Sequence, residues 1–91
     1  MLPRGEGFPR ILATCRFQAG ITQTELAKRL GIPTHTVISQ YEAGLRRFPI
    51  EKLVLLAQAT DTEPLLLIRS WLESYAPDIA KILFPIPESG R

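Results

Sequence analysis

Apolar residues recur along most of this chain at intervals of three and four positions, and no long run alternates with the period of two that marks a strand. Prolines and glycines divide the periodic stretches from one another. The pattern predicts helices over residues 9–19, 23–30, 35–43, 50–60 and 63–75, with a short additional helix over 76–84. The predicted fold class is therefore all-α.

The second of these helices carries its own start, buried face and end. Thr22 and Glu25 have the spacing of a capping box, in which the hydroxyl and the carboxylate each bind a free backbone N–H group. Gly31 can adopt the left-handed conformation that ends a helix. The apolar face between them is made by Leu26, Ala27 and Leu30.

A turn and a second polar helix follow at once. Residues 31–33 form the predicted turn, Thr34 is placed to cap the next helix, and small Ala27 lets another backbone approach closely. Two short helices joined in this way are typical of a helix-turn-helix, whose second helix enters the major groove of DNA.

Composition limits the choice of function without deciding it. The 91 residues make one domain with a small core, and the apolar content of 45% fits a folded globule. The net charge of +2 is too small to indicate nucleic acid on its own. Its distribution is more informative, because residues 1–49 carry seven Lys and Arg against three acidic residues, and residues 50–91 carry four against six. The N-terminal half suits an anionic partner.

The chain has one cysteine and one histidine, so we expect no metal site, no cofactor and no nucleophile pair. Cys15 lies on the apolar face of the first helix and is expected to be a small buried hydrophobe. No catalytic constellation is apparent, and the chain is not predicted to be an enzyme. No signal peptide or long apolar span is present, which predicts a cytoplasmic protein without a membrane partner.

The chain resembles the Cro and phage-repressor type of helix-turn-helix, the XRE family, over about residues 11–68. The matching pieces are Arg16, Gly20-Ile21-Thr22-Gln23, Glu25-Leu26-Ala27, Leu30-Gly31, Ser39-Gln40-Tyr41-Glu42-Ala43-Gly44 and Arg46-Arg47. The resemblance implies a five-helix DNA-binding domain, often dimeric, in which Arg16 pairs with Glu42. With the short additional C-terminal helix, we expect a flexible arm over 1–7, the helix-turn-helix domain over 8–75, and a helix and tail over 76–91.

The third helix has two possible registers, because the glycines that end the second and third helices are one residue further apart than is usual in the family. An extra residue in the turn, at Pro33, makes Ile38 and Tyr41 core contacts. An extra residue later in the chain would instead place Val37 and Gln40 in the core, which buries an amide without an evident partner. We therefore favour the first register.

The first register assigns contacts with double-stranded DNA. The first turn of the third helix and the residue one turn later can reach base edges, where a glutamine can pair with adenine and a Thr or Val methyl can pack on thymine. These candidate base contacts are His35, Thr36, Val37 and Gln40. Contacts with phosphates are implied at a helix N-terminus and in the basic loop after the third helix. These candidate phosphate contacts are Gln23, Arg46 and Arg47.

The C-terminal third is more apolar than one buried stripe requires. On the fifth helix, Leu65, Ile68 and Leu72 lie on one face, and a second apolar face remains. Either the sixth helix covers this surface within one chain, or another subunit does; the family's use of twofold sites favours a homodimer. The predicted dimer contacts are Leu67, Trp71, Tyr75, Ile79, Ile82 and Leu83.

These observations predict a sequence-specific DNA-binding transcriptional regulator, most simply a repressor that binds a twofold operator as a homodimer. A phage-type repressor, a restriction-modification controller and an antitoxin that represses its own operon are not separated by the sequence. The alternative is an adaptor that uses the same fold to bind a protein partner.

Overall fold

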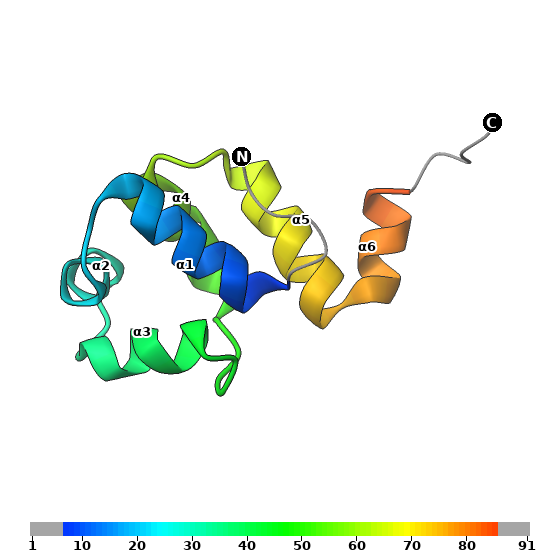
Figure 1. Ribbon diagram of the computed structural model, residues 1–91. Helices are drawn as coiled ribbons and strands as arrows, with labels where there is room; N and C mark the ends of the chain where they lie inside the picture. Colours follow the sequence, from blue (N-terminus) through cyan, green and yellow to red (C-terminus); the bar gives the residue numbers. More distant parts are fainter. Residues whose placement is uncertain (1–6, 86–91) are drawn as a thin grey trace.

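The computed structural model describes residues 7–85, and every regular element in that range is helical (Figure 1). The elements are α1 (Phe8–Ala19), α2 (Gln23–Leu30), α3 (His35–Glu42), the 3₁₀ turn η1 (Ile50–Lys52), α4 (Leu53–Thr60), α5 (Pro64–Tyr75) and α6 (Pro77–Leu83). The predicted all-α class is confirmed. Residues 1–6 of the predicted arm and 86–91 of the predicted tail lie outside the described range.

The ends of α2 form as its sequence predicts. The Thr22 hydroxyl accepts a hydrogen bond of 3.0 Å from the Glu25 backbone, and the Glu25 carboxylate accepts one of 2.7 Å from the Thr22 backbone. These contacts with Thr22, the backbone one first, hold the pKa of Glu25 below its ordinary value. The capping box therefore stabilises the fold above the ordinary pKa of glutamate and weakens as the pH falls through the lowered one. Gly31 ends the helix with a φ of 69°.

The start of α5 lies one residue later than the predicted start at residue 63, which would place the N-cap at Thr62. Glu63 is the N-cap, and its carboxylate accepts a hydrogen bond of 3.2 Å from the Leu65 backbone. The reason is Pro64, which has no N–H group to lose and occupies the first helical position, so the cap falls on the residue before it. The Thr62 hydroxyl lies 2.9 Å from that of Thr60 instead.

One core joins five of the helices. α1 packs against α3, α4 and α5, while α2 packs against α3 and α4. Phe8 and Phe48, both fully buried, lie with ring centroids 5.4 Å apart. Cys15 is buried as expected, and burial raises the pKa of its thiol.

The predicted division of α5 into an inner and an uncovered face is wrong in part, since Leu72 is buried as expected but other residues are not placed as predicted. Leu67 and Trp71, which are predicted for the uncovered face, are both buried in the core. Leu65, which is predicted for the inner face, is 55% exposed. At Trp71 the loop before α4 contributes to this burial, since its Phe48 carbonyl accepts a hydrogen bond of 2.7 Å from the Trp71 indole nitrogen. Leu67 and Trp71 therefore support the fold of a single chain and are not available to a second subunit.

α6 packs on α5 and extends away from the rest of the molecule (Figure 1). Ala80 is buried against the core, and Phe84 is partly buried with the Arg69 guanidinium 5.4 Å from its ring centroid. The sixth helix thus covers part of α5 within one chain. The exposed apolar side chains of α6 itself are Ile79, Ile82 and Leu83. No helix within residues 7–85 combines the length and the apolar character needed to span a bilayer.

We expect Thr22→Ala to lower the free energy of unfolding by about 0.5–2 kcal/mol, because it removes the hydroxyl that caps α2. Urea denaturation followed by circular dichroism measures the change. Thr24→Ala is the matched control, since Thr24 is an exposed threonine inside the same helix. An equal loss in both variants would show that the capping contact contributes nothing of its own.

Candidate nucleic-acid interface

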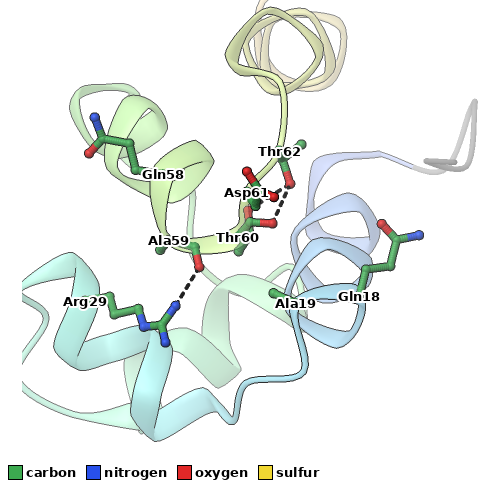
Figure 2. A pocket seen from close by; sticks show the side chains of 8 residues that line it. All are labelled: Gln18, Ala19, Arg29, Gln58, Ala59, Thr60, Asp61 and Thr62. Carbon is green, nitrogen blue, oxygen red and sulfur yellow. Dashed lines mark hydrogen bonds between the residues drawn. The ribbon is translucent and has the colours of Figure 1, made fainter.

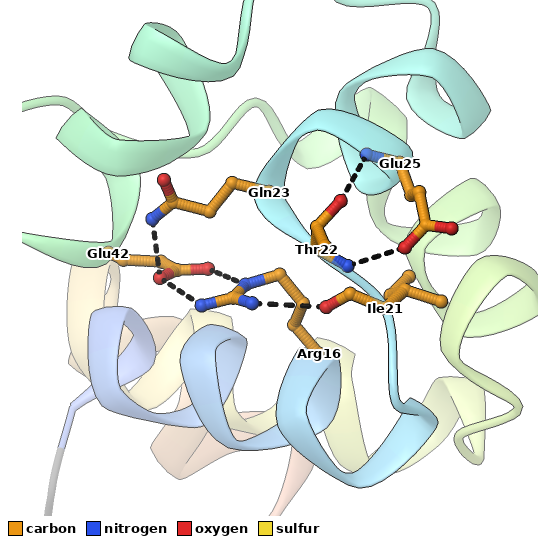
Figure 3. Close-up of polar contacts among 6 residues, drawn as sticks. All are labelled: Arg16, Ile21, Thr22, Gln23, Glu25 and Glu42. Atoms are coloured by element: carbon orange, nitrogen blue, oxygen red, sulfur yellow. Dashed lines mark hydrogen bonds and ion pairs between the residues drawn. The ribbon is translucent and has the colours of Figure 1, made fainter.

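A buried ion pair joins the first helix to the end of the third. Arg16 Nε lies 2.7 Å from Glu42 Oε2, and Arg16 Nη2 lies 3.1 Å from Glu42 Oε1. The third guanidinium nitrogen, Arg16 Nη1, donates a hydrogen bond of 3.0 Å to the Ile21 carbonyl. Each of the two charged side chains is only 10% exposed. The pair that the resemblance implied is therefore present as a two-point contact with a third anchor on the backbone (Figure 3).

Gln23 extends this network to the start of α2. Its side-chain amide nitrogen donates to Glu42 Oε1 at 3.1 Å (Figure 3). Glu42 is the last residue of α3 and Gln23 is the first of α2, so one carboxylate ties together two helix ends and Arg16 of α1. The relative placement of the two helices in the helix-turn-helix is fixed by polar contacts as well as by packing.

The third helix has the arrangement of the first register. Ile38 and Tyr41 are buried, and the Thr34 hydroxyl caps the helix by accepting from the Thr36 backbone at 3.2 Å. His35 and Thr36 are exposed on the first turn. The two other predicted base contacts, Val37 and Gln40, are partly buried, and Val37 packs against the core.

The two arginines of the loop after α3 have different surroundings, although both were predicted to contact phosphates. Arg46 Nε donates to Gln40 Oε1 at 3.0 Å. The Arg47 guanidinium lies 5.0 Å from the ring centroid of Tyr75 on α5. Both side chains are exposed, so both retain N–H groups that can reach a phosphate. Sequence spacing alone carries no signal for this difference, since Gln40 lies across a turn from Arg46 and Tyr75 is on a different helix from Arg47.

The matched family model, described as helix-turn-helix, covers residues 12–67, which is more than half of the chain. The protein belongs to the Cro and phage-repressor type of helix-turn-helix proteins, the XRE family. The membership supports DNA binding and transcription regulation. No match was found among curated proteins or among solved structures.

This helix-turn-helix protein has a polar hollow on another part of its surface (Figure 2). The hollow is lined by Gln18, Ala19, Arg29, Gln58, Ala59, Thr60, Asp61 and Thr62. Across it, Arg29 Nη1 donates to the Ala59 carbonyl at 2.9 Å and so links α2 to α4. Among residues 7–85 no group of three or more His, Cys, Asp or Glu could hold a metal ion. The contacts in the hollow are those of helix packing.

We expect Glu42→Ala to lower the free energy of unfolding by about 3–5 kcal/mol, because it leaves the Arg16 guanidinium buried without its counter-charge. Thermal and urea denaturation measure the loss. Glu73→Ala is the control, since Glu73 pairs with Arg69 at the surface at 3.1 Å and its loss is expected to cost about 0.5 kcal/mol or less. Similar losses in the two variants would contradict a special role for the buried pair.

Proposed function

We propose that this protein is a sequence-specific transcriptional repressor that binds a twofold DNA operator as a homodimer. The observation that supports the proposal best is the buried network of Arg16, Glu42 and Gln23, which holds α3 against α1 and α2 with its first turn exposed. A helix held in this way can enter the major groove without rearrangement, so less ordering is required on binding.

The proposed contacts fall into two sets. Side chains on the first turn of α3 and one turn later read base edges, while basic and helix-terminal groups on either side bind phosphates and set the register on the duplex. The proposed base contacts are His35, Thr36, Val37 and Gln40. The proposed phosphate contacts are Gln23, with the backbone at the start of α2, and the loop residues Arg46 and Arg47.

Selection from a pool of randomised DNA duplexes tests this function. We expect the wild-type chain to enrich a motif with twofold symmetry, with an affinity that falls steeply as salt increases. In the variant Thr36→Ala/Gln40→Ala, the affinity for that motif should fall by about 1–3 kcal/mol per lost base contact, while binding to random DNA stays nearly constant. Fluorescence anisotropy on the two kinds of duplex measures both affinities.

The control for this variant is Thr24→Ala/Gln58→Ala, which removes an exposed threonine and glutamine from α2 and α4. It should retain discrimination between motif and random DNA. If the α3 variant discriminates as well as the wild type, the proposed register of α3 on DNA is wrong. If no duplex is bound at all, the protein-partner alternative replaces the proposal.

The proposed dimer contact lies on α6 and the adjoining part of α5. The exposed apolar residues of this short helix are Ile79, Ile82 and Leu83. Tyr75, the last residue of α5, is half-buried. Two recognition helices related by a twofold axis must lie about 34 Å apart, one turn of DNA. A contact at α6 leaves α2 and α3 uncovered, because α6 packs on α5 (Figure 1).

We expect Ile82→Lys to convert a dimer to a monomer without unfolding the chain, since Ile82 is 77% exposed and its replacement opens no cavity. Light scattering over a range of concentrations measures the mass. Val54→Lys is the control, because Val54 is an apolar residue of α4 that is 52% exposed. A wild-type chain that is monomeric at high concentration would contradict the dimer and leave α6 as a surface for a different protein, as in an antitoxin.

A further inference from the structure

Arg46 makes a contact with the recognition helix that its charge and its place in the sequence do not indicate. Its Nε donates a hydrogen bond of 3.0 Å to Oε1 of Gln40, six residues earlier. Gln40 lies on α3 one turn beyond the exposed residues of the first turn. The planar guanidinium therefore holds the carbonyl end of this amide.

The orientation of a glutamine amide decides which base it can read. A freely rotating amide presents either its oxygen, an acceptor, or its nitrogen, which carries two N–H donors. In the major groove cytosine presents only the donor N4, whereas guanine, adenine and thymine each present at least one acceptor. An amide whose oxygen is held by an arginine is fixed in one orientation, with its N–H groups as the free end, and this orientation favours a base that carries an acceptor.

We propose that Arg46 is a positioning residue for base recognition, which orients the Gln40 amide with its N–H groups toward the DNA, so that a base with a major-groove acceptor is favoured over cytosine. This inference rests on the proposed function and names a specificity that the function alone does not supply. The other N–H groups of Arg46 remain able to bind a phosphate, so the residue contributes to affinity and to base choice.

Arg47 provides the matched comparison. It is the next residue, has the same charge and is equally exposed, but its guanidinium lies over the Tyr75 ring of α5. Removing Arg47 takes away one positive charge near the backbone of the DNA and leaves the contact between Arg46 and Gln40 intact. Its effect should therefore be the same on every sequence.

The experiment uses the full chain and a pool of randomised duplexes, with the bound fraction sequenced. Gln40→Glu locates the base position, because a carboxylate only accepts and should change the preference there to cytosine. At that position we expect the wild type to select against cytosine. We expect Arg46→Ala to accept cytosine there at least about fivefold more often than the wild type does. We expect Arg47→Ala to select against cytosine as the wild type does.

Melting curves establish that each variant is folded, as the exposure of both arginines leads us to expect. If Arg46→Ala weakens binding to all sequences alike and leaves the preference at the Gln40 position unchanged, Arg46 is a phosphate contact and the proposal is overturned. A wild type that prefers cytosine at that position also overturns it. A wild type that enriches no motif rejects the proposed function itself, a result distinct from either of these.

Discussion

The structure depends on one buried ion pair, that between Arg16 and Glu42. Taking two charges out of water is costly, and an apolar pair of similar volume is often equally stable. What an apolar pair cannot supply is direction: the guanidinium contacts Glu42 at two points and the Ile21 carbonyl at a third. These contacts fix both the rotation of α3 and its position along α1. For a helix that is proposed to present particular side chains to a DNA groove, this orientation matters more than added stability.

A second, non-local anchor continues beyond α3. The Phe48 carbonyl accepts from the Trp71 indole, and Phe48 packs edge-on against Tyr41 with ring centroids 5.1 Å apart. The loop between α3 and α4 is thus attached to the core at its end, while Arg46 and Arg47 project from its middle. The same contacts link this loop to α5, next to the surface proposed for dimerisation. The surface proposed for DNA binding and the surface proposed for dimerisation are therefore connected through this loop within one chain.

Local signals predicted most of the fold, and non-local contacts account for what they missed. The capping box at Thr22, the left-handed glycine at the end of α2 and the apolar spacing of α3 depend on residues a few positions apart, and all appear as expected. The burial of Trp71 does not follow from the pattern of α5 alone, because its hydrogen-bond partner, Phe48, is 23 positions away. The same holds at the interface: the exposed first turn of α3 could be predicted, but the different surroundings of Arg46 and Arg47 depend on partners that spacing does not reveal.

The distribution of contacts across α3 separates folding from recognition. Ile38, Tyr41 and Glu42 are committed to the core and to the buried pair, so substitutions there change stability before they change binding. His35 and Thr36 are exposed and can vary with little effect on the fold. Gln40 belongs to neither group, because its oxygen is bound by an arginine of the following loop. In the proposed complex Gln40 touches both DNA and Arg46, so it cannot vary alone, and the proposed base choice depends on the loop as well as on the helix.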